Sequence, residues 1–186
     1  MTFVVDGTNG LTFNDATTQA STATNASNIS SGTLGKARLP TGSVLQVVNS
    51  TYATQTTNAS TSVYASTGLT ASITPLFTTS KILVFVNHNG NVVTGNTSNG
   101  GIRIKLQRNG SDLTVIDGMS AYNGNSANNS GGATTSISYL DSPSTTSSTT
   151  YSTQFAVRNV GTAYVQYNDG AGLQSVSTIT LMEIAG

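Results

Sequence analysis

His88 is the only histidine of the chain, and serines and aspartates that could join it in a Ser/His/Asp triad occur throughout the sequence. It follows an apolar run and lies in the stretch Asn87-His88-Asn89-Gly90, whose composition is typical of a turn. No G-x-S-x-G motif is present to raise a nucleophilic serine between a strand and a helix. We therefore predict that His88 is a solvent-facing turn residue and not a general base.

The acidic residues do not form an obvious catalytic pair. Asp112 and Asp117 are five positions apart on one expected strand, which should place them on opposite faces, and Glu183 is the only glutamate. The segment 6–10, Asp-Gly-Thr-Asn-Gly, offers oxygen ligands for calcium but lacks the later bidentate Glu of an EF-hand loop, so a plain turn is favoured. We expect no catalytic residue, no bound metal, no cofactor and no enzymatic activity.

Three of the seven cations, Arg103, Lys105 and Arg108, lie on one expected hairpin, with Arg103 and Lys105 on the same face. The plainest interpretation is a solvated face, or charges that discourage pairing at a sheet edge. A salt bridge between subunits and a contact with an anionic ligand are the alternatives.

A long loop between Met119 and Ala133 is the best candidate for a contact surface. Tyr122 lies there among Asn123, Asn125 and other asparagines. Amides bind hydroxyls through paired hydrogen bonds, and a tyrosine ring offers a flat apolar face, so this composition would suit a sugar. A flexible loop without a ligand is the competing interpretation.

Composition excludes several partners. Charged residues make up 8% of the 186 residues, against about a quarter in an ordinary domain, and the net charge is zero, so neither nucleic acid nor an anionic membrane surface is an expected partner. Ser, Thr and Asn together contribute 75 residues, so neutral polar groups take the place of ions. Cysteine is absent, which removes disulfides and thiolate sites. We also expect no signal peptide and no membrane insertion.

The elements that would carry these residues are short strands. Pro40 and Gly42 mark a boundary between an N-terminal segment, residues 1–42, and a head domain, residues 43–186. Period-two patterns in the head favour an all-β, antiparallel, jelly-roll-like sandwich with hydroxyl-coated outer faces. The run Lys81–Val86 is apolar on both faces, which is typical of a central, well-covered strand. Asn109-Gly110 predicts a type I′ turn between two strands. The other expected strands lie at 44–48, 62–65, 69–73, 102–106, 113–116, 137–140, 151–157, 163–167 and 176–184.

The N-terminal segment has a different pattern. Two β-prone runs, residues 3–5 and 11–13, flank the turn at 6–10 and predict a short hairpin. Residues 14–38 carry only two sizeable apolar side chains and cannot bury enough surface to order themselves alone. We expect an extended segment that becomes ordered on a partner, with apolar contacts from Phe3, Val5, Leu11, Phe13, Ile29 and Leu34.

Two stretches carry a family resemblance. The sequence NISSGTLGKARLPTGSVLQVV, Asn28 to Val48, resembles the stem-to-head junction of bacteriophage tail-fibre and related virion proteins. The run ISYLDSPSTTSSTTYSTQF, Ile137 to Phe155, and the ending STITLMEIAG are similar to C-terminal heads of marine and cyanobacterial phage proteins.

This resemblance implies a homotrimeric structural protein of the virion, attached through its N-terminus to capsid, portal or tail, with a β-sandwich head directed outward. The stretch between hairpin and head is short, which favours a short fibre, a head fibre or a capsid-decoration protein over a long tail fibre. The alternative is a lectin-like module that recognises a host surface glycan during attachment.

Overall fold

The computed structural model describes residues 4–6, 10–12, 18–19, 34–95, 100–121, 131–168 and 175–186. The chain forms two compact units, Met1–Leu39 and Pro40–Gly186. In the first unit, strands β1 (Val4–Asp6), β2 (Gly10–Thr12) and β3 (Thr18–Gln19) form an antiparallel sheet, with Val5 opposite Leu11. The predicted N-terminal hairpin is thereby confirmed, and a short 3-10 helix, Lys36–Arg38, ends this unit.

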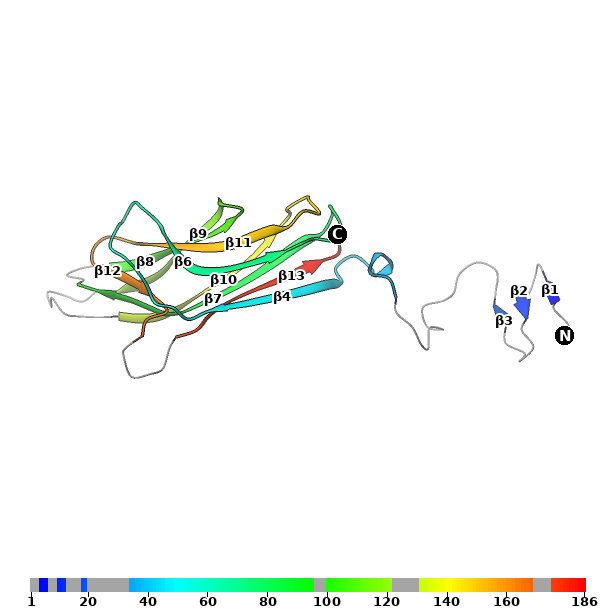
Figure 1. Cartoon of the computed structure of the whole chain (residues 1–186), viewed down its shortest axis with the longest axis horizontal. Coiled ribbons are helices and arrows are strands. Elements are labelled where there is room, and N and C mark those ends of the chain that lie inside the picture. The colour runs from blue at the N-terminus through cyan, green and yellow to red at the C-terminus, as the bar shows by residue number, and fades with distance from the viewer. Residues whose placement is uncertain are drawn as a thin grey trace. The chain divides into compact units, whose positions relative to one another are not determined.

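The described residues of the second unit form ten strands and contain no α-helix (Figure 1). Its strands are β4 (Val44–Tyr52), β5 (Thr56–Asn58), β6 (Ala65–Ile73), β7 (Lys81–Thr94), β8 (Gly100–Arg108), β9 (Ser111–Ala121), β10 (Gly131–Asp141), β11 (Thr149–Val157), β12 (Thr162–Val165) and β13 (Ser177–Ile184).

Eight of these strands have the topology of a jelly roll. The larger sheet has the order β4-β13-β7-β10. On the edge of β7 that faces β13, the C-terminal end of β7 pairs with β12 in place of β13, and β5 pairs with β12. The smaller sheet has the order β6-β11-β8-β9, and every pairing is antiparallel. The sequence prediction of an antiparallel jelly-roll sandwich is confirmed, because among these eight strands only β8 and β9 follow one another within one sheet, and every other connection crosses between the sheets.

The core lies between the two sheets and is filled by every second residue of each strand. Tyr151 and Phe155 of β11 are fully buried and are its largest members. Aliphatic side chains from both sheets surround them: Leu69, Ile73, Ile82, Val84, Val86, Ile102, Ile104, Leu106, Ile137, Ile179 and Leu181. This alternation is what a sheet with one buried face requires.

The turn at Asn109-Gly110 joins β8 to β9 as predicted. Both residues have positive φ, 48° and 83°, the combination that a type I′ turn needs. Because Gly110 has no Cβ, it adopts this conformation without steric strain. The predicted hairpin of the two strands is confirmed.

The strand expected at residues 62–65 is wrong, since β6 begins only at Ala65. The hydroxyl oxygen of Ser60 accepts hydrogen bonds from the backbone N–H groups of Ser62 (3.3 Å) and Val63 (2.9 Å). These local bonds replace the pairing that a strand would need and bend the chain.

The central strand β7 is covered on one face only. Ile82, Val84 and Val86 are buried between the sheets, as expected. Leu83 is half-buried and Phe85 is 40% exposed on the opposite face. The prediction that this run is covered on both sides is therefore wrong for the single chain, because the sandwich places nothing from its described residues over the outer face of the larger sheet.

Candidate functional site

The charged face predicted around Arg103 and Lys105 lies on the outer side of the smaller sheet. Arg103 Nε donates to Asp117 Oδ1 (3.0 Å), and Lys105 Nζ donates to Asp112 Oδ2 (2.7 Å). The Lys105 ammonium also lies 4.1 Å from the centre of the Tyr64 ring. Each of the two cations therefore has a carboxylate partner on the neighbouring strand, which is the geometry of a solvated, charge-balanced hairpin.

The two aspartates share a face, contrary to the prediction from their spacing. Leu106 pairs with Thr114 and Gln107 with Asp112, so Leu113 is an extra residue in β9. This β-bulge turns an odd spacing into an even one, and both carboxylates face solvent. Hydrogen bonds from Lys105 and then from Gln107 hold the pKa of Asp112 below its ordinary value.

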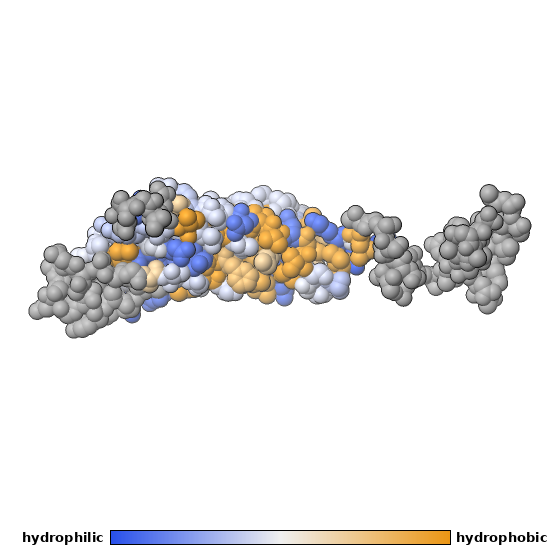
Figure 2. Space-filling model, turned by 90° about the horizontal axis from the view of Figure 1, so that it is seen from below, coloured by the Kyte–Doolittle hydropathy of each residue, from blue (hydrophilic) through white to orange (hydrophobic). Residues whose placement is uncertain are grey.

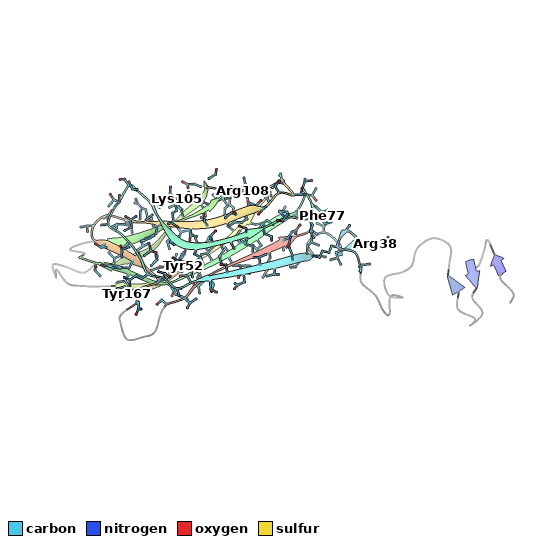
Figure 3. All side chains as sticks on the ribbon, viewed as in Figure 1. Arg38, Tyr52, Phe77, Lys105, Arg108 and Tyr167 are labelled. Carbon is cyan, nitrogen blue, oxygen red and sulfur yellow. The ribbon has the colours of Figure 1, made fainter. Side chains whose placement is uncertain are left out.

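The third cation of the hairpin has a different role. Arg108, labelled with Lys105 in Figure 3, donates through Nη1 to both carboxylate oxygens of Asp141 (2.8 and 2.9 Å). The hydroxyl of Tyr151 also donates to Asp141 (2.6 Å). Burial, followed by the hydrogen bond to Asp141, raises the pKa of this tyrosine. The cluster joins β8 and β11 of one sheet to β10 of the other, so it stabilises the sandwich.

His88 is fully buried inside β7, so its prediction as a solvent-facing turn residue is wrong. Its Nε2 lies 3.0 Å from the hydroxyl of Thr153, which lies 2.6 Å from the hydroxyl of Thr67. Gln166 Nε2 donates toward His88 Nδ1 at 3.4 Å. With the Gln166 amide in this orientation, Nδ1 accepts, which matches the tautomer that carries the proton on Nε2 and donates to Thr153. Burial lowers the pKa of His88 to about 4.

This polar chain connects the larger sheet, which holds His88, to β6 and β11 of the smaller sheet. The N–H and O–H groups of this series are engaged in hydrogen bonds to one another across the interior, and the imidazole is neutral near pH 7. A general base needs access to a substrate proton, and this imidazole is 0% exposed. The arrangement therefore supports packing of the two sheets.

Glu183 is a further buried ionisable group. Its carboxylate accepts hydrogen bonds from Leu76 N–H (2.7 Å), the Ser80 hydroxyl (2.6 Å) and the Gln46 amide. Burial alone would raise the pKa of Glu183, but these hydrogen bonds from side chains and backbone outweigh it and lower the pKa. The carboxylate ties the connection between β6 and β7 to the end of β13.

Several predicted site residues lie outside the described part of the chain. They are the sugar-contact candidates Tyr122, Asn123 and Asn125 and the anchoring candidates Phe3, Phe13 and Ile29. Val5 and Leu11 are paired across the N-terminal hairpin, and Leu34 is half-buried. Their predicted contacts with a particle or a glycan stay predictions.

The described residues hold no group of three or more His, Cys, Asp or Glu side chains placed to bind a metal ion. Within the same residues, no helix has the length and apolar character to cross a membrane.

Sequence reasoning missed one surface feature of the larger sheet. Val47, Met182, Leu83 and Leu140 are directly opposite one another on β4, β13, β7 and β10, and all four point outward. We call them the apolar row. The one sequence signal for this row was the apolar character of both faces of residues 81–86. That pattern does not show which strands lie beside β7 or which of their residues are opposite it.

No family model matches the chain, and no curated protein matches it in sequence. Among solved structures, the VP2 subviral particle of infectious bursal disease virus is similar at a TM-score of 0.37 and 14% identity, over 76% of this chain and 33% of that one. Dimeric latent PorU from Porphyromonas gingivalis is similar at a TM-score of 0.27 and 11% identity, over 79% of this chain and 14% of that one. The chain thus spans a third or less of either protein.

Proposed function

We propose that this protein is a structural component of a bacteriophage virion, a short homotrimeric fibre or capsid-decoration protein. Its N-terminal unit anchors it to the particle and its jelly-roll head faces outward. Its place of action is the assembled virion, and its role is mechanical and adhesive, without catalysis.

The observation that carries the proposal is the position of the junction between the two units. The stretch Asn28 to Val48, which resembles a stem-to-head junction of phage fibres, spans the point in the sequence where the compact unit Pro40–Gly186 begins. A hairpin too small to form a core of its own lies on the other side of this junction. Such a unit gains stability when it docks on a partner, and this is the behaviour expected of an anchor.

The head contributes a second line of support. Its buried ionisable residues, His88, Asp141 and Glu183, are each held by partners that are distant in the sequence. Polar groups used in this way connect the sheets and leave little freedom for proton transfer to a substrate. This use of the rare charges suits a rigid structural module.

Deletion of residues 1–40 tests the anchoring role. Particles are assembled in host cells that supply either the full chain or the truncated chain, purified, and examined for the protein by quantitative mass spectrometry. We expect the full chain in the particles and the truncated chain in the unbound fraction.

The matched control is full-length Val115→Glu, which changes an exposed residue of the head and should be incorporated normally. Folding of the truncated head is checked by its far-UV circular dichroism and its unfolding midpoint. Incorporation of a folded truncated head at the level of the full chain would refute anchoring by the N-terminal unit.

A further inference from the structure

The outer face of the larger sheet carries a concentration of apolar side chains that the smaller sheet lacks. In the apolar row, Val47 is 54% exposed and Leu140 is 52% exposed, while Leu83 and Met182 between them are half-buried. Val44, Phe85 and Ile184 extend the row on the same face. The space-filling view shows apolar side chains gathered over a broad area along one side of this unit (Figure 2).

The smaller sheet provides the contrast within the same molecule. Its outward positions hold hydroxyls and paired charges, such as Thr70, Ser72 and the Arg103–Asp117 pair. Val115, at 48% exposure, is its one exposed large hydrophobic residue among those described. Single exposed valines are ordinary, whereas a row spanning four adjacent strands marks an interaction surface.

We propose that the outer face of the larger sheet packs against another copy of this chain. The inference rests on the homotrimer of the proposed function: the three copies of this face would meet around the three-fold axis, each packing against the other two. Among the described residues of this face, Lys81 carries the only charge, so identical faces do not repel one another and no oppositely charged partner is selected.

The face is large enough to form most of a standard interface. Four strands of eight or more residues make a surface roughly 20 Å wide and roughly 27 Å long, by ordinary strand spacing and rise. Its accessible area exceeds this flat footprint and approaches the approximately 800 Å² per partner that a standard interface buries. Thr and Asn side chains further along the same strands, such as Asn49 and Thr180, provide a polar rim.

The pattern of β7 agrees with this assignment. A strand that is apolar on both faces belongs in a sheet covered on both sides. The jelly roll covers the side of Ile82, Val84 and Val86, and a second copy would cover the side of Leu83 and Phe85. Both apolar faces of residues 81–86 would then be covered.

The test compares Val47→Glu and Leu140→Glu with Val115→Glu in the full chain by sedimentation velocity over a range of concentrations. All three variants change the net charge equally and replace residues of similar exposure, on opposite sides of the sandwich. We expect Val47→Glu and Leu140→Glu to weaken association at least about 100-fold and to shift the species toward the 19.0 kDa monomer. Val115→Glu should sediment like the unmodified protein.

Each variant is first checked by circular dichroism and urea unfolding, and a Val47→Thr variant of nearly the same shape is used if Val47→Glu or Leu140→Glu does not fold. An oligomer whose dissociation constant is unchanged in Val47→Glu and Leu140→Glu would overturn the assigned face while leaving a homo-oligomeric virion protein intact. A wild-type chain that stays monomeric at about 100 μM would overturn the self-association itself. Particle incorporation is measured separately, so the failure of anchoring is distinguishable from both results.

Discussion

Lowering the pH from 7 to 5 is expected to destabilise the head through His88. The imidazole is buried and neutral, and burial lowers its pKa from 6.5 to about 4. Protonation would place a second N–H at Nδ1, opposite the Nε2 amide group of Gln166, which is itself a donor. The cost of protonation is mainly the desolvation of the charged imidazole, since a turn of the Gln166 amide would bring its unpartnered Oε1 to Nδ1–H.

The sign follows from proton linkage. Because the pKa of His88 is lower in the folded state than in the unfolded state, the unfolded chain binds more protons below pH 6.5. The stabilisation is complete above pH 6.5 and is lost as the pH falls toward 4. Between pH 7 and pH 5 the free energy of unfolding should decrease by about 2 kcal/mol. For a domain of this size, that loss lowers the Tm by roughly 4–8 °C.

The assay is urea unfolding at several pH values between 5 and 7.5, at one fixed protein concentration because association also affects stability. His88→Gln is the control, since it removes the only histidine of the chain. The pKa values of Glu183 and Asp112 are lowered and therefore lie below this window. Stability of His88→Gln should accordingly change little between pH 7 and pH 5, whatever its absolute value.

A wild-type protein whose stability is flat over this range would refute the reasoning, and so would a variant that keeps the wild-type slope. Proton NMR of the single imidazole gives an independent reading. A titration midpoint near 6.5 in the folded protein would mean that the ring is not held neutral by burial.

Three further changes test other parts of the structure. Glu183→Ala leaves the Leu76 N–H and the Ser80 hydroxyl without their acceptor, so the free energy of unfolding in urea should fall by about 3 kcal/mol. The control Asp117→Ala removes an exposed carboxylate and should lower it by less than about 1 kcal/mol. Equal losses in the two variants would contradict the role given to the buried carboxylate. Gly110→Ala meets no neighbouring atom but has a φ of 83°, so thermal unfolding should show a loss of about 1–2 kcal/mol. Gly35→Ala, equally open and without a positive φ, should lose less, and similar losses would argue against strain in the turn. Finally, sedimentation equilibrium at 0.05 and 0.5 M NaCl should give nearly equal association constants, because the proposed interface is apolar; dissociation at the higher salt would show that ion pairs hold the copies together.

The fold was readable from the sequence because local patterns determine most of it. Alternation of apolar residues in strands such as Tyr151–Val157 identifies the buried face, and Asn109-Gly110 identifies the turn between β8 and β9. The topology then follows from a long series of short antiparallel strands without helices. These signals need no information from distant residues.

The location of His88 was not readable, because it depends on partners far along the chain. The stretch Asn87-His88-Asn89-Gly90 has turn composition, yet β7 continues through it. Gly90 takes a φ of 63° there, and its carbonyl accepts a hydrogen bond from Tyr167 N–H, so the backbone of β7 bends without leaving the sheet. Thr153, which lies on β11, and Gln166, which follows the end of β12, provide the partners of the imidazole.

The apolar row on the outer face of the larger sheet also could not be predicted from local sequence patterns. Val47, Leu83, Leu140 and Met182 look like ordinary strand residues when each is considered in its own segment. They form a row only after the strand order and register bring them together. The bulge at Leu113 likewise changes the face of Asp112 through a single inserted residue that spacing does not reveal.

The central claim, that this chain is an anchored structural component of a virion, is tested most directly by cryo-electron microscopy of the intact particle. The account predicts jelly-roll heads projecting from capsid, portal or tail, associated through the outer face of the larger sheet, with residues 1–39 in contact with the particle. Particles that lack the protein, or that hold it through the head with residues 1–39 directed away from the surface, would contradict it.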